Sequence, residues 1–336
     1  MRRTICSLYS IFLLLFFILS SCGTKKIFIN VKRPAEVNLK GYEKIAVGEL
    51  AGRKKQHAND MADEIAAALY ETKRFEVVDR KHIKTIIAEQ ELGLTGLIDE
   101  TSAPELGKII GTAAMIFGRV QTDEYKEKTS KRDWVEKKKK GKKGNKKTVK
   151  IPHTTYYREG KYKLAVNLKI VDMETGKMLA VKTLTASKKK TTQKTDAKAP
   201  KIDRTVLYRN CLQSIKSQFT KLAAPYDAKV EAEFETDDSL PEVEQALVQF
   251  KIGEWDEGIK FLENASNKTE LKQETKAKAF YNLGLAKMYG GECEEAIELF
   301  KKSVKLNPDS SRYQDAVIKA KKEKEKADKL KEQEDV

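Results

Sequence analysis

The chain has 336 residues, and its 66 Lys and Arg exceed its 50 Asp and Glu, for a formal net charge of +16. This length favours two domains rather than one. A Lys excess often indicates a nucleic-acid partner, but the first residues indicate export and argue against nucleic acid, which leaves anionic lipid, a surface glycan or an acidic protein as better-placed partners.

Residues 1–21 have the pattern of a secretory signal peptide. Arg2 and Arg3 precede nine consecutive apolar residues, Ile11 to Leu19. This run is too short for a membrane helix, which needs about 20 apolar residues, and small residues follow it, as in signal peptides.

The signal peptide ends in a lipobox, Leu19-Ser20-Ser21-Cys22. At such a site the Cys is lipidated and becomes the mature N-terminus, so we expect a lipid anchor on Cys22 and a tether over residues 22–42. Gly23 rather than Asp after the Cys favours the outer membrane, with the chain facing the periplasm or the cell surface. Nothing later in the chain is apolar enough to span a bilayer as a helix.

Residues 43–226 predict an α/β domain in which helices cover a sheet. Apolar residues recur at strand spacing in some segments and at helix spacing in others, and Ser102 with Glu105 forms a capping-box pattern. In chain order the segments predict a strand at 43–50, a helix at 59–75, a strand at 75–78, a helix around 83–92, a short helix from Ser102 and a strand at 112–120.

A basic segment follows. Lys126 to Lys150 holds 13 Lys or Arg and 3 acids, and a block of like charge repels itself and remains solvated. We therefore expect a disordered loop at residues 122–160, open to contact with anionic lipid headgroups. Its most basic part comprises Lys137, Lys138, Lys139, Lys140, Lys142, Lys143, Lys146 and Lys147.

The alternation of Tyr162, Leu164, Val166, Leu168 and Ile170 predicts a half-buried strand. The Glu174-Thr175-Gly176 turn joins it to a returning strand at 178–184, because Gly supplies the positive φ of a tight turn. A polar loop is expected at 186–203. A helix at 206–226 closes the domain and places Cys211 in the core.

Three stretches of this domain resemble the CsgG family, the outer-membrane lipoproteins of curli secretion. They are ALYETKRFEVVDRKHIKTIIAEQELG, TAAMIFGRV and YKLAVNLKIVDMETGKMLAVKTLTASK, and the DMETG turn between two strands is the most specific of them. The resemblance implies a three-layer α/β domain that self-associates or docks onto an envelope protein. Related periplasmic lipoproteins, some of which activate penicillin-binding proteins, share the same α/β core.

In the curli channel, two hairpins leave this core and cross the membrane as strands of a multisubunit barrel. They would fall at about 121–161 and 185–203. A membrane strand needs about 9–11 residues with alternate residues apolar, and Lys-rich SKRDWVEKKKKGKKGNKKTVK and SKKKTTQKTDAKAP lack that alternation. We therefore expect no barrel from these segments. Pro152 indicates an edge strand or a bend.

Residues 238–336 predict an all-α domain of tetratricopeptide repeats. The segment 277–308 has the spacing of this motif, and a partial copy lies at 246–265. Lys287 stands where the motif usually has an aromatic residue. A closing helix is expected at 311–336, with its last, fully charged turns frayed. The residues expected to pack the repeats are Phe280, Leu283, Gly284, Gly291, Ala296, Phe300 and Pro308, with Gly253 and Trp255 in the earlier copy.

No pattern indicates catalysis, a cofactor or a metal. The three His, at 57, 82 and 153, lack metal-ligand spacing, no Cys pair has CxxC spacing, and no phosphate-binding glycine loop or nucleophile elbow occurs. Cys211 and Cys293 lie in different predicted domains and are expected to remain unpaired.

These patterns predict a non-catalytic outer-membrane lipoprotein that assembles or recruits an envelope complex, with protein partners bound by the repeats and homo-oligomerisation left open. Three alternatives remain: a subunit of a curli-type secretion channel, an activator of penicillin-binding proteins, and a surface adhesin that uses the basic segment.

Overall fold

The computed structural model describes residues 23–78, 114–140 and 147–334, which belong to two compact units. The α/β unit comprises residues 35–224. The repeat unit comprises the residues up to Pro34 together with those from Pro225 onward. The helices expected around 83–92 and from Ser102 lie outside the described residues.

The α/β unit is built on a five-stranded sheet of order β3-β2-β4-β5-β6. Strand β2 is parallel to β3 and β4, while β4, β5 and β6 are antiparallel neighbours. The α/β class predicted from the sequence is confirmed, and Gly176 has the positive φ, 70°, expected for the turn between β5 and β6. The strands are β2 (Lys44–Ala51), β3 (Glu76–Val78), β4 (Ala114–Lys140), β5 (Lys147–Asp172) and β6 (Met178–Thr195).

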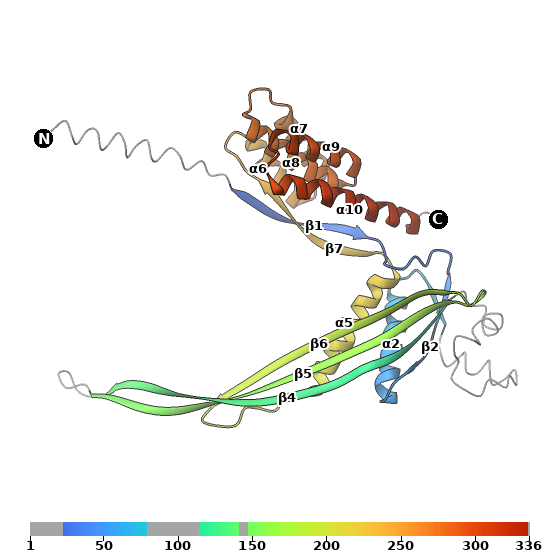
Figure 1. Ribbon diagram of the computed structural model, residues 1–336, viewed down its shortest axis with the longest axis vertical. Coiled ribbons are helices and arrows are strands. Elements are labelled where there is room, and N and C mark those ends of the chain that lie inside the picture. The colour runs from blue at the N-terminus through green and yellow to red at the C-terminus, as the bar shows by residue number, and fades with distance from the viewer. Residues whose placement is uncertain (1–22, 79–113, 141–146, 335–336) are drawn as a thin grey trace. The chain divides into compact units, whose positions relative to one another are not determined.

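Helices α2 (Lys55–Glu71) and α5 (Arg204–Ala223) lie on one face of this sheet (Figure 1). Helix α5 begins where the carboxylate of Asp203 accepts a hydrogen bond from the Thr205 backbone N–H at 2.8 Å, as an N-cap does. The two helices bury one apolar side each against alternate residues of the strands. The core includes Ile45, Met61, Ile65, Leu69, Ile116, Val166, Leu168, Cys211, Ile215 and Phe219.

The segment expected to be a disordered loop at 122–160 is instead a continuation of two strands. Strand β4 runs to Lys140, β5 begins at Lys147, and the antiparallel register from Thr122↔Ala165 to Lys140↔Lys147 is unbroken. The polar loop expected at 186–203 is likewise wrong, because residues up to Thr195 belong to β6 and pair with β5. Figure 1 shows these three strands running past the helices as a narrow sheet, which we call the strand extension (residues 122–140, 147–164 and 186–195).

The strand extension is ordered because backbone pairing and alternation outweigh the charge repulsion that the composition suggested. Successive side chains lie on opposite faces of a strand, so the lysines are divided between two faces, and some have acidic neighbours, as in the 2.7 Å Lys189–Glu159 ion pair. Pro152 lies beyond Thr155, which pairs with the last residue of β6, so β5 is an edge strand there, as expected for Pro.

The tether expected at 22–42 is also wrong for its described residues. Strand β1 (Thr24–Arg33) pairs antiparallel with β7 (Tyr226–Glu235) along its whole length. Further on, Val37 and Leu39 are buried in the core of the α/β unit. The Ile27, Ile29 and Val31 alternation is the signal that could have identified β1.

The repeat unit contains five helices among its described residues, and they confirm the repeat prediction. Cys293 begins α9 and Cys211 lies in α5, and both are buried and free, as expected. No described helix is long and apolar enough to cross a membrane. The helices are α6 (Pro241–Ile252), α7 (Trp255–Asn267), α8 (Gln273–Gly290), α9 (Cys293–Leu306) and α10 (Ser311–Glu334).

Candidate functional sites

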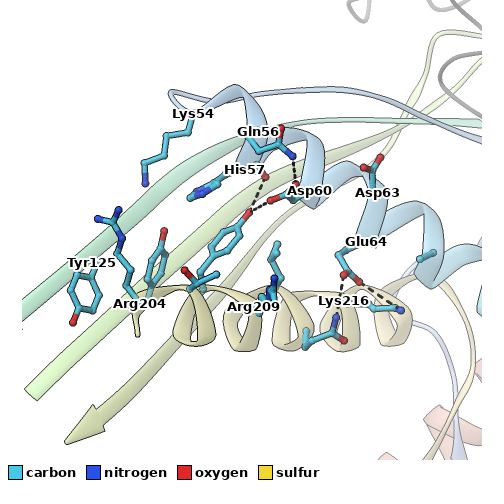
Figure 2. Close-up of a pocket in the computed structure, with 16 residues that line it drawn as sticks. Lys54, Gln56, His57, Asp60, Asp63, Glu64, Tyr125, Arg204, Arg209 and Lys216 are labelled. Carbon is cyan, nitrogen blue, oxygen red and sulfur yellow. Dashed lines mark hydrogen bonds and ion pairs between the residues drawn. The ribbon is translucent and has the colours of Figure 1, made fainter. Parts of the chain in front are cut away.

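The α/β unit has an open groove of about 1090 Å³ between α2 and α5. Figure 2 shows the two helices side by side over the sheet, with charged side chains of both reaching into the space between them. Lys54 and His57 come from the start of α2, and Arg204 and Arg209 from the first turns of α5. The groove is therefore lined by polar groups of two rigid elements.

Asp123 lies at the centre of a polar cluster at one end of this groove, which we call the Asp123 cluster (Lys54, His57, Asp123, Tyr162 and Tyr208). Its carboxylate is 2.8 Å from Nδ1 of His57 and 3.0 Å from Nζ of Lys54, and it also accepts a hydrogen bond from the Tyr162 hydroxyl. The His57 ring stacks on Tyr208, with ring centroids 4.0 Å apart.

Burial alone would raise the pKa of Asp123, but the hydrogen bonds from Tyr162, Lys54 and His57 outweigh it and hold the pKa below its usual value. Burial and the hydrogen bond to Asp123 raise the pKa of Tyr162. Asp123 is thus a carboxylate at neutral pH and Tyr162 a neutral donor. Because Asp123 follows the register shift between Val120 and Thr122, the cluster fixes β4 to α2 where the strand extension begins.

The other end of the groove is formed by ion pairs between α2 and α5. Lys216 of α5 lies 2.6 Å from Glu71 and 3.7 Å from Glu64 of α2, and Gln213 donates to Glu64 at 3.1 Å. Charges of both signs at the rim suit docking of a polar protein surface. Among the described residues, no group of three or more His, Cys, Asp or Glu side chains is placed to hold a metal ion.

The sequence did not indicate that His57 meets Asp123, 66 positions later. His57 lies in the first turn of α2, which begins at Lys55, ahead of the helix that the sequence predicted from residue 59. His82 is outside the described residues. His153 of β5 stacks on Trp134, with centroids 4.8 Å apart, and contacts Asp196 at 2.5 Å, which fixes the end of β6 onto β5.

In the repeat unit, α6, α8 and α10 contact the chain's own two-stranded ribbon, β1 and β7. Lys25 of β1 pairs with Glu244 of α6 at 2.5 Å, and Arg33 of β1 pairs with the buried Glu323 of α10. Asn282 of α8 is fully buried and hydrogen-bonds the backbone of Glu235 in β7. The ribbon therefore covers part of the surface of α6, α8 and α10.

These contacts also show why the last turns of α10, expected to fray, are ordered to Glu334. Lys32 of β1 lies 2.8 Å from Glu334, and the Arg33–Glu323 pair is buried. The ribbon thus supports a helix whose own sequence is almost entirely charged.

The predicted repeat-packing residues lie where two helices of a pair meet or at helix ends. A Cβ on Gly284 would stand 2.7 Å from the ring of Phe300, so only Gly allows this approach of α8 to α9. Gly253 and Gly291 end α6 and α8 in left-handed conformations. Of the others, Leu283, Ala296 and Phe300 are buried, Phe280 and Trp255 are partly buried, and Pro308 follows α9.

Lys287, where the repeat motif usually has an aromatic residue, is buried among three acids. Its Nζ lies 3.1 Å from Glu292, 3.3 Å from Glu295 and 3.3 Å from Glu263. Burial would lower its pKa, but these hydrogen-bonded carboxylates raise it. A charged cluster thus links α7, α8 and α9.

The structure describes only some of the basic residues that the sequence predicted as a site. Lys137 to Lys140 end β4 on alternating faces, Lys147 begins β5, and Lys142, Lys143 and Lys146 lie outside the described residues. The register places three lysines side by side across the strand extension, Lys126↔Lys161 and Lys161↔Lys189. In this lysine row (Lys126, Lys161 and Lys189), two side chains also have acidic partners: Lys126 lies 2.9 Å from Glu124 and Lys189 lies 2.7 Å from Glu159.

Comparison with protein families decides the classification. Residues 26–204, just over half of the chain, match the family described as Curli production assembly/transport component CsgG. The chain belongs to the CsgG family. Residues 278–310 match a tetratricopeptide repeat, so both resemblances noted in the sequence are confirmed.

Solved structures similar to this CsgG-family chain include three bacterial proteins. Lipoprotein GNA1162 from Neisseria meningitidis has 15% identity and a TM-score of 0.28, covering 44% of this chain and 81% of that one. The PelC dodecamer from Paraburkholderia phytofirmans has 12% identity and a TM-score of 0.29, covering 60% and 99%. The LpoB C-terminal domain from Salmonella enterica has 8% identity and a TM-score of 0.28, covering 45% and 87%.

A search of curated proteins gave no significant match.

Proposed function

We propose that this CsgG-family chain is a non-catalytic outer-membrane lipoprotein that acts as an assembly or scaffold component of the envelope. The observation that carries the proposal is the joining of a CsgG-family α/β unit to a unit of tetratricopeptide repeats in one chain. Stacked helical repeats serve as protein-binding surfaces, and the groove of the α/β unit offers a second docking surface.

In this proposal, lipidation of Cys22 anchors the scaffold to the outer membrane. Gly23 follows Cys22 directly, and its carbonyl accepts a hydrogen bond from the Thr236 N–H at 2.8 Å. With no free tether between the lipid and β1, the anchor holds the repeat unit close to the membrane. Stable attachment needs more than one acyl chain, which a diacylglyceryl group on the Cys supplies.

The anchor is tested by replacing Cys22 with Ser and following the chain through cell fractionation and mass spectrometry of its N-terminus. The wild-type chain is expected in the outer-membrane fraction with a lipidated Cys22, and the variant in a soluble or signal-retaining form. Cys211→Ser and Cys293→Ser are the matched controls, because both thiols are buried within their units. An unmodified Cys22 in the wild-type chain would overturn the anchor.

The scaffold role is tested by in-cell crosslinking of the full-length chain, followed by identification of the crosslinked residues. We expect a different envelope protein joined to either unit in a fixed ratio. Crosslinks only between copies of this chain would contradict the proposal.

A channel subunit is a second candidate, favoured by one observation. The strand extension projects from the α/β unit where the family resemblance places the two membrane-crossing hairpins. Its side chains argue against membrane insertion, because Lys126 and Lys128 lie on one face and Lys131 on the other. A Lys facing lipid near the midplane costs about 2–4 kcal/mol, so neither face suits lipid.

A further inference from the structure

The strand extension narrows from three strands to two at the end of β6. Thr195, the last residue of β6, pairs with Thr155 of β5, and beyond this pair only β4 and β5 continue together. The chain leaves the sheet at Asp196, which has a positive φ of 57°. Residues other than glycine rarely adopt this left-handed conformation, although Asp does so more readily than most. The turn therefore depends on the contacts that hold Asp196.

Asp196 is held by two consecutive residues of β5. Its backbone N–H donates to the Thr154 carbonyl at 2.7 Å, and one carboxylate oxygen accepts from the Thr154 N–H at 2.8 Å. The other carboxylate oxygen lies 2.5 Å from Nδ1 of His153. Because histidine changes its charge between about pH 5 and 8, one of the groups that fasten the end of β6 is titratable.

The second ring nitrogen of His153 faces an acid of the third strand. Nε2 lies 3.4 Å from a carboxylate oxygen of Glu136 in β4, and this nitrogen is buried without a hydrogen-bond partner. The ring thus stands between two carboxylates, one near each nitrogen. A neutral imidazole has a proton on only one nitrogen and turns the lone pair of the other towards an acid, whereas an imidazolium has a proton on both. The arrangement favours the imidazolium.

The other groups around the ring add no further acid. Trp134 of β4 stacks on it, with ring centroids 4.8 Å apart. On the same strand, Lys138 lies 3.1 Å from Glu136 and balances part of that carboxylate's charge. The neighbours of His153 on its own face of β5 are Ile151 and Thr155, which are uncharged. By register and alternation, the charged side chains of the described residues around the ring are Arg132, Glu136 and Lys138 of β4 and Asp196 after β6.

The contacts favour the charged form of His153 and of Asp196. The hydrogen bond to Asp196 raises the pKa of His153 above its usual value despite desolvation, and the charge of Glu136 adds to the effect. The hydrogen bond from His153 lowers the pKa of Asp196. Ring and carboxylates are therefore charged together from mildly acidic pH up to the pKa of His153. As the pH rises through that value, the ring loses its proton and its attraction to both acids.

We infer that His153 is a proton-dependent clamp, which in its charged form ties the end of β6 to β4 and β5 and in its neutral form loosens that end. The neutral ring still donates from Nδ1 to Asp196, but without the positive charge, and its bare Nε2 faces Glu136. The length of the three-stranded sheet thus depends on pH. Under the export proposed above, the strand extension responds to the pH outside the cytoplasm, whatever partner the chain binds.

The charge of His153 is followed by the fluorescence of Trp134 in the mature full-length chain in detergent. A Trp255→Phe background leaves Trp134 as the only tryptophan, and a protonated imidazole stacked on an indole quenches its emission. Emission should rise with pH around a midpoint above the ordinary histidine value of about 6.5. His153→Gln should remove the transition. A midpoint at or below the ordinary value, or a transition that survives in His153→Gln, would overturn the inference.

Two variants remove the acids one at a time. Asp196→Asn keeps a residue that tolerates the left-handed turn but removes the charge, so the midpoint should fall by about half a pH unit or more. Glu136→Gln should lower it by a smaller amount. Glu124→Gln is the matched control, because Glu124 lies on the same face of β4 and pairs with Lys126, and it should keep the parent midpoint. Equal midpoints in all four chains would contradict a clamp between two acids.

Hydrogen exchange tests whether the charge holds the strand end. Rates are corrected for the intrinsic pH dependence of amide exchange and are measured for the N–H groups of Thr154 and Asp196. In the parent chain, protection at pH 6 should exceed protection at pH 9 by about fivefold or more, and His153→Gln should show the weaker protection at both. Amides of β5 around Leu168 should not change, which shows that each chain is folded. Titration of Trp134 emission without a change in protection would show that His153 clamps nothing.

Discussion

The side-chain amide of Asn282 in α8 holds the backbone of Glu235 in β7 by two hydrogen bonds. The Glu235 N–H donates to Oδ1 at 2.9 Å, and Nδ2 donates to the Glu235 carbonyl at 2.7 Å. Asn282 is fully buried, so no water replaces these partners. This pair fixes β7, and with it β1, onto the helical repeats, and the N-terminal strand becomes part of the repeat unit.

Replacing Asn282 with Leu should destabilise the repeat unit. A buried donor or acceptor left without a partner costs about 1–3 kcal/mol, and two backbone groups of Glu235 are affected. Urea unfolding followed by Trp255 fluorescence, in the Trp134→Phe background, measures the change. Asn264→Leu, exposed on α7, is the matched control, and equal unfolding midpoints for the two variants would contradict the role of Asn282.

The Asp123 cluster predicts a pH-dependent stability of the α/β unit. The pKa of Asp123 is lower in the folded chain than its usual value, so its contribution is complete at neutral pH and is lost as the pH falls through the folded pKa. Asp123→Asn should therefore destabilise the unit at pH 7 and differ progressively less from the parent chain below about pH 4.

Urea midpoints followed by Trp134 fluorescence, in a Trp255→Phe background, test this pH dependence. Glu174→Gln, exposed in the turn after β5, is the control and should change little at any pH. A difference between Asp123→Asn and its parent that stays constant from pH 7 to pH 3 would show that the cluster acts only by packing.

Gly284 is predicted to tolerate no side chain. Gly284→Ala places a methyl group against the buried Phe300 ring, and overpacking of this kind costs about 1–3 kcal/mol. Phe300→Leu alone should destabilise by leaving space, and the double variant should lose less than the sum of the two single variants. Thermal unfolding of the four chains gives the coupling, and strict additivity would show that the two residues do not compete for space.

The lysine row predicts a substitution that stabilises the strand extension. Lys161→Glu converts two like-charge cross-strand pairs, with Lys126 and with Lys189, into pairs of opposite charge. Each such pair contributes about 0.2–1 kcal/mol. Hydrogen exchange should then slow in the extension at low salt. Lys163→Glu has the opposite expectation, because Lys163 pairs with Glu124. If the amides of β4, β5 and β6 within the extension exchanged fully in the parent chain, the extension would not be formed.

Local patterns were sufficient to predict most elements of the fold. The alternation from Tyr162 to Ile170 and the Gly176 turn predicted the β5–β6 hairpin, and the repeat motif predicted α8 and α9. These elements depend on side chains close in sequence. Strand β1 was missed because its partner β7 is about 200 residues away, and the charges at both its ends resemble a solvated tether.

The strand extension and the Asp123 cluster show a second reason for incomplete prediction. Composition alone suggested that 122–160 would repel itself, but lysines on alternate faces of paired strands are separated by the sheet. The Asp123 cluster joins residues from β4, β5, α2 and α5, and none of its members belongs to a local motif. Sequence spacing indicates what a segment forms, whereas these sites depend on which segments meet.

Sedimentation velocity of the full lipidated chain in detergent, combined with planar-bilayer conductance, tests the scaffold account most directly. The account predicts a monomer or dimer that forms no pore, because the strand extension has lysines on both faces. A ring of many copies that conducts ions would contradict it and would identify the chain as a channel subunit.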